Sequence, residues 1–143
     1  MFLEAILLIL FAILVCFNST EIDADTFRSK VLTSDEVYVV KFYSAMCGSC
    51  KEFNPAWERF EEKAKNVETA KINIDNKDAQ SLAKELGILK EGIPNVRAFT
   101  KKGSKKGVAI TQDVAPYKTL FQNVKKVVKN LPKRESDNKY LRK

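Results

Sequence analysis

The chain has 143 residues, of which 45% are hydrophobic and 30% charged, so it has the size of one globular domain and no room for a second. It contains no histidine and three cysteines, too few ligands for a structural zinc site and too few cysteines for a disulfide-held scaffold, and we expect no metal and no cofactor. The net charge of +7 is concentrated after residue 100, where 13 basic residues stand against 3 acidic ones; we interpret this excess as solvated surface and expect no nucleic-acid partner.

The first seventeen residues form an apolar segment with one charged side chain, Glu4, and the polar sequence NSTEIDAD follows. This pattern is typical of a secretory signal peptide, which we predict over residues 1–18. The alternative is an uncleaved signal anchor, since about 17 apolar residues is the lower limit for a helix that spans a bilayer. Cleavage would remove Cys16 and leave two cysteines in the mature chain.

Two helices and a strand are predicted before residue 65. Residues 24–32 have helical spacing, with Asp23 or Asp25 as a candidate N-cap. Residues 37–43, VYVVKFY, are an almost unbroken run of β-branched and aromatic residues, which is typical of a buried central strand. Residues 48–64 carry large apolar side chains at positions i, i+4 and i+7, which predicts an amphipathic helix.

The second half of the chain continues this alternation. In chain order, the pattern predicts a strand over 69–75, a helix over 77–86, strands over 95–100 and 108–111, and a helix over 116–130. The sequence KKGSKKG between the last two strands predicts an antiparallel hairpin. Residues 131–143 lack apolar periodicity, and we expect a basic, disordered tail. This order predicts an α/β fold with a mixed central sheet flanked by helices on both faces.

Cys47 and Cys50 lie between the predicted central strand and the helix that follows it. Two cysteines three apart can form a disulfide on a tight turn, and the start of a helix stabilises negative charge on the first sulfur. Because the thiolate is the nucleophile, we predict that Cys47 attacks and that Cys50, one turn deeper, resolves the mixed disulfide. The alternative is that both are ordinary buried cysteines spaced by chance.

The segment FYSAMCGSCKEFNPAWERF, residues 42–60, resembles the active-site strand and helix of thioredoxin-fold domains in the protein disulfide isomerase family. The later sequences AKINID, LAKELGI and GIP match the same family in order, so the resemblance covers about residues 22–130. It implies a thioredoxin fold, with residues 19–130 as the domain between the signal peptide and the tail.

By this resemblance Pro94, in Gly92-Ile93-Pro94, matches the proline that faces the cysteine pair, and it would be cis. Ile93 would offer its backbone to an extended substrate peptide. The alternative is an ordinary proline at the entry of a strand.

The active-site loop of Met46, Gly48 and Ser49 departs from the family pattern at two positions. Met46 stands where the family usually has Trp, and Ser49 replaces the His of isomerases or the Pro of thioredoxins. The first change keeps an apolar contact surface, and the second alters the surroundings of the thiolate.

Lys41 is the sharpest departure, because the family carries a buried Asp or Glu there that aids proton transfer at the resolving cysteine. Lys71 matches the lysine partner of that acid. A buried pair of lysines is repulsive, so at least one should lose its proton or reach water. One hypothesis is that neutral Lys41 serves as the base for Cys50; the other is that one lysine reaches solvent and water is the base.

These features predict an enzyme, a protein thiol-disulfide oxidoreductase resembling disulfide isomerases, that acts on protein or peptide thiols and disulfides. We expect a monomer in the endoplasmic reticulum lumen or outside the cell, recycled by a redox partner or glutathione. It would contact a membrane only through an uncleaved N-terminal segment. The alternative is a chaperone-like or partner-binding module that captures clients as mixed disulfides.

Overall fold

The computed structural model describes residues 2, 20–102 and 104–143, and the predicted signal peptide lies, apart from Phe2, outside this part of the chain. Four strands form one mixed sheet in the order β2-β1-β3-β4. The strands are β1 (Tyr38–Tyr43), β2 (Glu68–Asn73), β3 (Asn95–Phe99) and β4 (Val108–Thr111). β1 pairs in parallel with β2 and antiparallel with β3, and β3 pairs antiparallel with β4. The predicted hairpin of the last two strands is therefore confirmed.

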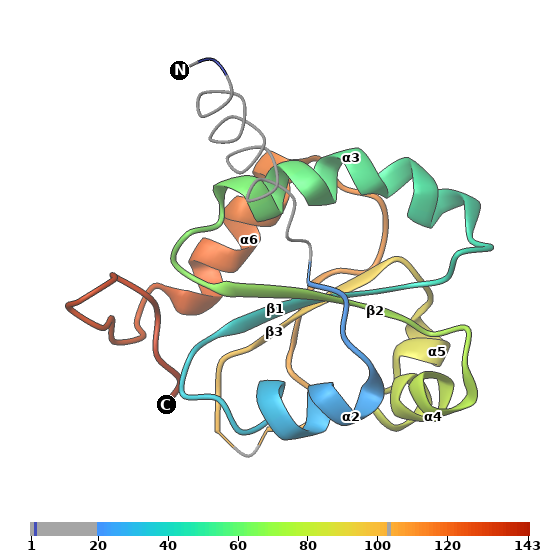
Figure 1. Cartoon of the computed structure of the whole chain (residues 1–143), viewed down its shortest axis with the longest axis horizontal. Helices are drawn as coiled ribbons and strands as arrows, with labels where there is room; N and C mark the ends of the chain where they lie inside the picture. Colours follow the sequence, from blue (N-terminus) through green and yellow to red (C-terminus); the bar gives the residue numbers. More distant parts are fainter. Residues whose placement is uncertain (1, 3–19, 103) are drawn as a thin grey trace.

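Helices cover both faces of the sheet (Figure 1). One face carries α2 (Ala24–Thr26), the π-helical turn η1 (Phe27–Val31), α4 (Lys77–Glu85) and α5 (Ile88–Glu91). The other face carries α3 (Gly48–Lys63) and α6 (Tyr117–Val128). The predicted α/β class, with a mixed sheet between two helical layers, is confirmed.

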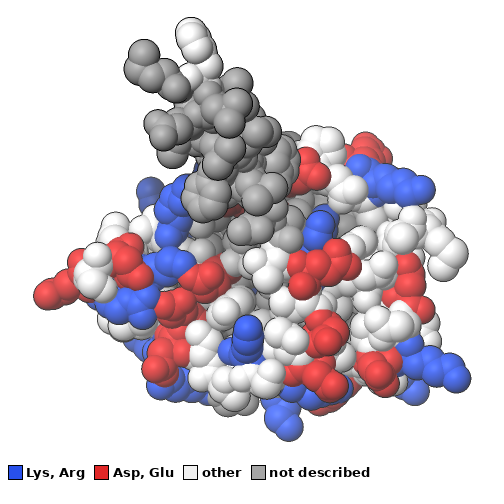
Figure 2. Space-filling model, viewed as in Figure 1, with Lys and Arg blue, Asp and Glu red and all other residues white. Residues whose placement is uncertain are grey.

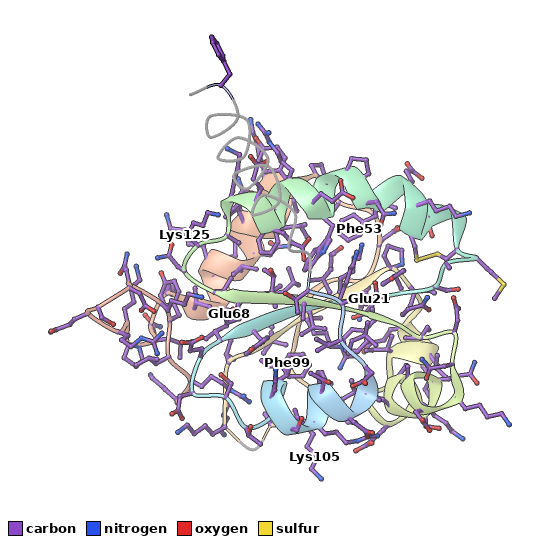
Figure 3. All side chains as sticks on the ribbon, in the orientation of Figure 1. Glu21, Phe53, Glu68, Phe99, Lys105 and Lys125 are labelled. Carbon is purple, nitrogen blue, oxygen red and sulfur yellow. A yellow bond between two sulfur atoms is a disulfide. The ribbon has the colours of Figure 1, made fainter. Side chains whose placement is uncertain are left out.

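Each face of the sheet has its own apolar core, because neighbouring residues of a strand point to opposite faces. In β1, Val40 and Phe42 pack toward α2 and α4, whereas Val39 packs toward α3 and α6. Figure 3 shows the same division for two labelled side chains, Phe53 beneath α3 and Phe99 toward α2. The central strand is buried on both faces, as its unbroken apolar sequence predicted.

The local sequence determines where the helices begin and end. Asp23 is the N-cap of α2, and its Oδ1 accepts a hydrogen bond from the Thr26 amide at 2.7 Å. Gly87 follows α4 with a φ of +82°, a left-handed conformation that favours glycine and ends the helix at the predicted point. The helix predicted over 24–32 becomes the short α2 and the π-helical turn η1.

The C-terminal segment from 131 to 143 corrects a prediction, because it packs on the domain instead of being disordered. Arg142 is 5% exposed, and the Tyr140 side chain packs against the core beneath α3 and α6. The backbone of this segment forms isolated bridges from Leu141 to Glu36 and from Tyr140 to Lys133. The prediction of disorder relied on the lack of apolar periodicity in this segment. The segment is held in place instead by buried hydrogen bonds to backbone carbonyls.

The two edges of the sheet differ. At the β2 edge, the Ile22 amide donates to the Lys71 carbonyl and the Lys71 amide donates to the Thr20 carbonyl, both at 3.0 Å. The other edge is β4, a four-residue strand whose pairing with β3 is interrupted by a register shift between Val96 and Arg97. Val108 on this edge is 42% exposed.

Basic and acidic side chains are interspersed on the face of the molecule shown in Figure 2. Ion pairs join the C-terminal segment to the domain, such as Arg134 with Glu36 and Lys139 with Glu68. Part of the basic excess after residue 100 therefore neutralises acidic residues of the first hundred.

Among the described residues, none of the helices combines the length and the apolar character needed to cross a membrane.

Candidate active site

The loop between β1 and α3 is held by one carboxylate, Asp75. The Ser44 hydroxyl donates to its Oδ1 at 2.5 Å, and the Ala45 amide donates to its Oδ2 at 2.9 Å. These hydrogen bonds hold the pKa of Asp75 below its ordinary value. The Met46 amide in turn donates to the Ser44 hydroxyl oxygen at 3.1 Å. The loop thus enters α3 in a fixed geometry.

Cys47 is the N-cap of α3 and is joined to Cys50 by a disulfide, with the two Cα atoms 5.2 Å apart. The Cys50 amide donates to Cys47 Sγ at 3.1 Å, so the sulfur takes the place that a capping oxygen usually occupies. Ser49 Oγ lies 3.3 Å from the same sulfur. Cys50 is only 1% exposed, whereas Cys47 is partly open to solvent.

Met46 immediately precedes the pair and is 84% exposed. This exposed apolar side chain lies next to the accessible sulfur in the sequence. It provides an apolar contact surface beside Cys47. Figure 3 shows the disulfide in yellow at the start of α3.

The loop before β3 brings a second backbone segment to the disulfide. The Ile93–Pro94 peptide bond is cis, as the family resemblance implied. The Ile93 carbonyl oxygen lies 3.9 Å from Cys47 Sγ, while the Pro94 side chain is buried. The half-buried Ile93 thus presents its backbone beside the accessible sulfur.

A buried polar network holds this loop, and the sequence did not predict it. Arg97 is 4% exposed and donates to Glu91 Oε2 at 2.6 Å and to the Leu86 carbonyl at 2.9 Å. Asn95 Nδ2 donates to the same Glu91 oxygen at 3.0 Å. These contacts keep the pKa of Glu91 below its ordinary value and tie α5 to β3 on either side of Ile93–Pro94. A charged residue inside the apolar strand NVRAF was the available signal.

Lys41 lies in the middle of β1 and is 2% exposed. Its Nζ donates to Asn54 Oδ1 at 2.9 Å and lies over the rings of Tyr43 and Trp57, 5.0 and 5.6 Å from their centroids. Burial, with the repulsion of Lys71 as a second cause, lowers the pKa of Lys41 to about 8. Asn54, four residues after Cys50 on α3, was not predicted, and nothing in its sequence context marks it.

Lys71 is opposite Lys41 in the parallel register of β1 and β2, but its side chain points to the surface. Its Nζ lies 3.9 Å from Glu21 Oε2, and the Tyr43 hydroxyl donates to Glu21 Oε1 at 2.8 Å. Burial and the Glu21 carboxylate raise the pKa of Tyr43. Lys41 is therefore the buried lysine with a lowered pKa, and Lys71 is the one that reaches a carboxylate near solvent.

Over residues 20–102 and 104–143, the structure contains no cluster of three or more histidine, cysteine or acidic side chains that could hold a metal ion.

A family model described as Thioredoxin matches residues 18–126. The chain belongs to the thioredoxin family. The match covers the disulfide, the cis-proline loop and the whole sheet. It ends before the C-terminal segment, so the packing of residues 131–143 is a feature of this chain outside the matched region.

Several thioredoxin-fold proteins resemble the chain. It is 37% identical over 84 residues to protein disulfide-isomerase A6 of Mesocricetus auratus, a match that covers 57% of this chain and 19% of the relative. It is 38% identical over 79 residues to protein disulfide-isomerase 2-3 of Arabidopsis thaliana, covering 55% and 17%. The chain spans about a fifth of the length of these relatives.

Among solved structures, the Trx4 domain of ERdj5 superimposes with a TM-score of 0.65 at 25% identity. The alignment covers 79% of this chain and 97% of that domain. The chain therefore corresponds to one thioredoxin domain of such multidomain proteins.

Proposed function

We propose that this chain is a protein thiol-disulfide oxidoreductase that acts through Cys47 and Cys50. One observation supports this most strongly: a partly exposed sulfur at the first turn of α3 is bonded to a buried sulfur, with the Ile93 carbonyl 3.9 Å away. Thioredoxin-fold domains of this kind act on protein thiols and disulfides. The arrangement leaves Cys47 as the sulfur that a client can reach.

In the oxidising direction, a client thiolate attacks Cys47 Sγ and breaks the Cys47–Cys50 bond, so that Cys50 leaves as a thiolate. A second client thiolate then attacks the client sulfur of the mixed disulfide and releases Cys47 as a thiolate. Two electrons pass from the client to the pair, and the client gains one disulfide. In the reducing direction the same steps run backward, starting from the Cys47 thiolate.

The start of α3 would stabilise that thiolate. The Cys50 amide already points at Cys47 Sγ, and Ser49 Oγ is close enough to donate a second hydrogen bond. Gly48, between Cys47 and Ser49, is exposed, and a Cβ added there would meet no atom within 4 Å. Met46 would contact apolar side chains of the client, and Ile93 would pair with its backbone beside Pro94.

Lys41 would take part in proton transfer at Cys50. With a pKa of about 8, it holds the proton in part of the population near neutral pH and can release it there. Lys71 would act through its charge, because its repulsion helps to lower the pKa of Lys41. The other possibility is that water serves as the base.

The proposed location, oligomeric state and recycling partner follow from the sequence and its relatives. We place the protein in the secretory pathway, in the endoplasmic reticulum lumen or outside the cell, because of the apolar segment over residues 1–18 and the disulfide isomerases among its relatives. The thioredoxin-like domain would extend from residue 19 to 130, with residues 131–143 packed on it, and would act as a monomer. Glutathione or a redox partner would recycle the pair.

The test is reduction of insulin and reactivation of scrambled ribonuclease by the full chain, with Cys47→Ser as the control. We expect turnover in at least one assay and none from the variant. A chain that forms stable mixed disulfides but never turns over would be a capturing module, and the enzymatic proposal would be wrong.

A further inference from the structure

The buried amine of Lys41 lies beneath the helix that carries the disulfide. It contacts Asn54, which is one turn, about 5.4 Å, along α3 from Cys50. Residues four apart on a helix share one face, so Asn54 and Cys50 both project from α3 toward the sheet. Cys50 is 1% exposed and Lys41 is 2% exposed. Both groups are therefore shielded from bulk water, which would otherwise weaken an electrostatic interaction between them.

We propose that the charge on Lys41 shifts the redox equilibrium of the Cys47–Cys50 pair toward the dithiol and makes the domain a stronger oxidant than one with an apolar residue at this position. The proposal rests on the proposed function, since it concerns the same pair. Its physical basis is that the disulfide carries no charge, whereas reduction near neutral pH creates a thiolate.

An ammonium close to a thiolate stabilises it, and an opposite charge at short range typically lowers the pKa of an acid by 1–3 units. The ammonium has little effect on the neutral disulfide. It therefore stabilises the reduced form selectively, and a more stable reduced form is a stronger oxidant. A buried carboxylate at this position would have the opposite effect.

The coupling is reciprocal. If the charge of Lys41 favours the thiolate, the thiolate must favour the charge of Lys41 to the same extent. In the oxidised chain the pKa of Lys41 is about 8, and reduction should raise it. Between the two pKa values, reduction takes up one additional proton at Lys41 Nζ. The advantage given by Lys41 should therefore be largest below about pH 8 and should disappear at higher pH.

Charged groups on β2, on α3 and before α2 also influence whether the Lys41 amine is protonated. Lys71 on β2 disfavours its charge, while Glu58 and Glu61 on α3 and Glu21 before α2 favour it. Tyr43 on β1 stays protonated because its own pKa is raised. The residue opposite Lys41 on β3 is Val96, which carries no charge. The pKa of Lys41, lowered to about 8, lies close to the working range of a thiol.

The test is the equilibrium of the full chain with glutathione across pH, comparing the natural sequence with Lys41→Met. At about pH 7.5 we expect the variant to give an equilibrium constant for reduction about tenfold lower, equivalent to about 30 mV. The gap should close as the pH rises toward about 10. The matched control is Lys51→Met, which removes an exposed charge directly after Cys50 and should change the constant less than about twofold.

Equal constants for Lys41→Met and the natural chain would overturn the proposal, as would a gap that Lys51→Met reproduces. A pair that never exchanges with glutathione in any of these chains would instead contradict the proposed function.

A direct titration needs no substitution. The Cε and Hε signals of Lys41, followed by NMR, should show a pKa at least one unit higher in the reduced chain than in the oxidised chain. Identical values in both states would show that the amine and the sulfurs are not coupled.

Discussion

Three basic side chains, Lys41, Arg97 and Arg142, are buried in the described part of the chain. The first and the last of them are held in different ways. Arg142, in the C-terminal segment, donates to the carbonyls of Val31, Ser34 and Lys101 at 2.6, 3.2 and 2.8 Å. Lys41 donates a hydrogen bond to Asn54 and otherwise faces two aromatic rings. Burial lowers the pKa of both groups, but a guanidinium remains protonated whereas an ammonium with a pKa of about 8 can titrate.

The two residues also belong to different regions of the molecule. Arg142 lies near the start of β1, where its amide donates to the Asp35 carbonyl at 2.7 Å, and Figure 1 shows the C-terminus far from the start of α3. Lys41 lies beneath the helix of the disulfide. The fixed charge of Arg142 joins segments distant in sequence through its carbonyl partners, whereas the titratable charge of Lys41 would serve the proposed chemistry. The four predictions below test this distinction.

The largest effect should come from Cys47→Ser, which removes the accessible sulfur. We expect disulfide exchange to fall to the uncatalysed rate, because a serine hydroxyl is not ionised at neutral pH and cannot form the mixed disulfide. Insulin reduction measures this. The native circular dichroism spectrum should persist, since the C-terminal segment and both cores are untouched. Residual turnover would mean that the Cys50 thiolate can itself attack the disulfides of insulin.

Arg142→Met should lower the free energy of unfolding by about 2–4 kcal/mol, because three buried carbonyls lose a charged donor. Denaturant titration of the oxidised chain measures it, with Lys143→Met, an exposed neighbour, as the control. The equilibrium constant with glutathione should not change. A change in that constant would contradict the separation of the two regions.

Lys41→Met should remove a pH dependence of stability. The folded pKa of Lys41 is about 8 against an ordinary 10.5, so between these values the unfolded chain binds a proton that the folded chain has lost. The free energy of unfolding of the natural chain should therefore rise by about 3 kcal/mol across this window. Denaturation of both oxidised chains at a series of pH values tests this. A natural chain whose stability relative to the variant stays constant over the window would show that Lys41 has an ordinary pKa.

The smallest effect should come from Ser49→Ala. The variant loses the hydroxyl that lies 3.3 Å from Cys47 Sγ, so the pKa of the Cys47 thiol should rise by up to about one unit. The ultraviolet absorbance of the thiolate during a pH titration of the reduced chain measures the change. Gly48→Ala provides a control, since an added methyl group there meets no atom within 4 Å. An unchanged pKa would mean that the helix start alone stabilises the thiolate.

The sequence predicted those parts of the fold that depend on periodicity. The apolar run of β1 and the stripe of Phe53, Trp57 and Phe60 on α3 lie where expected. Only one arrangement of the strand and the helix buries all of these side chains, so their periodicity predicts it. The position of the cysteine pair at the start of α3 follows from the same order of elements. The cis state of Pro94 came from resemblance to a family and not from any local pattern.

Much of what the sequence did not predict depends on contacts between distant residues. The carbonyl partners of Arg142 lie 41 to 111 residues away in the chain and belong to residues with no shared pattern. The hydrogen bond from Lys41 to Asn54 joins residues 13 apart, and those from Asn95 and Arg97 to Glu91 join residues four and six apart. These shorter contacts were missed because no local pattern marks them. A backbone carbonyl is present at every position, so no sequence signal shows which carbonyls will accept a buried donor.

The edges of the sheet determine how easily an unfolded client chain could add to the domain as a further strand. An extended polypeptide can add to any open strand edge and start aggregation. Here the β2 edge is occupied by the segment from Thr20 to Ile22, and β4 is four residues long, preceded by four lysines and interrupted in its register. A short, irregular and positively charged edge is a poor template for a further strand. A client held beside Ile93 would therefore find few other places on the sheet to which it could attach, and it could leave once its sulfur was released.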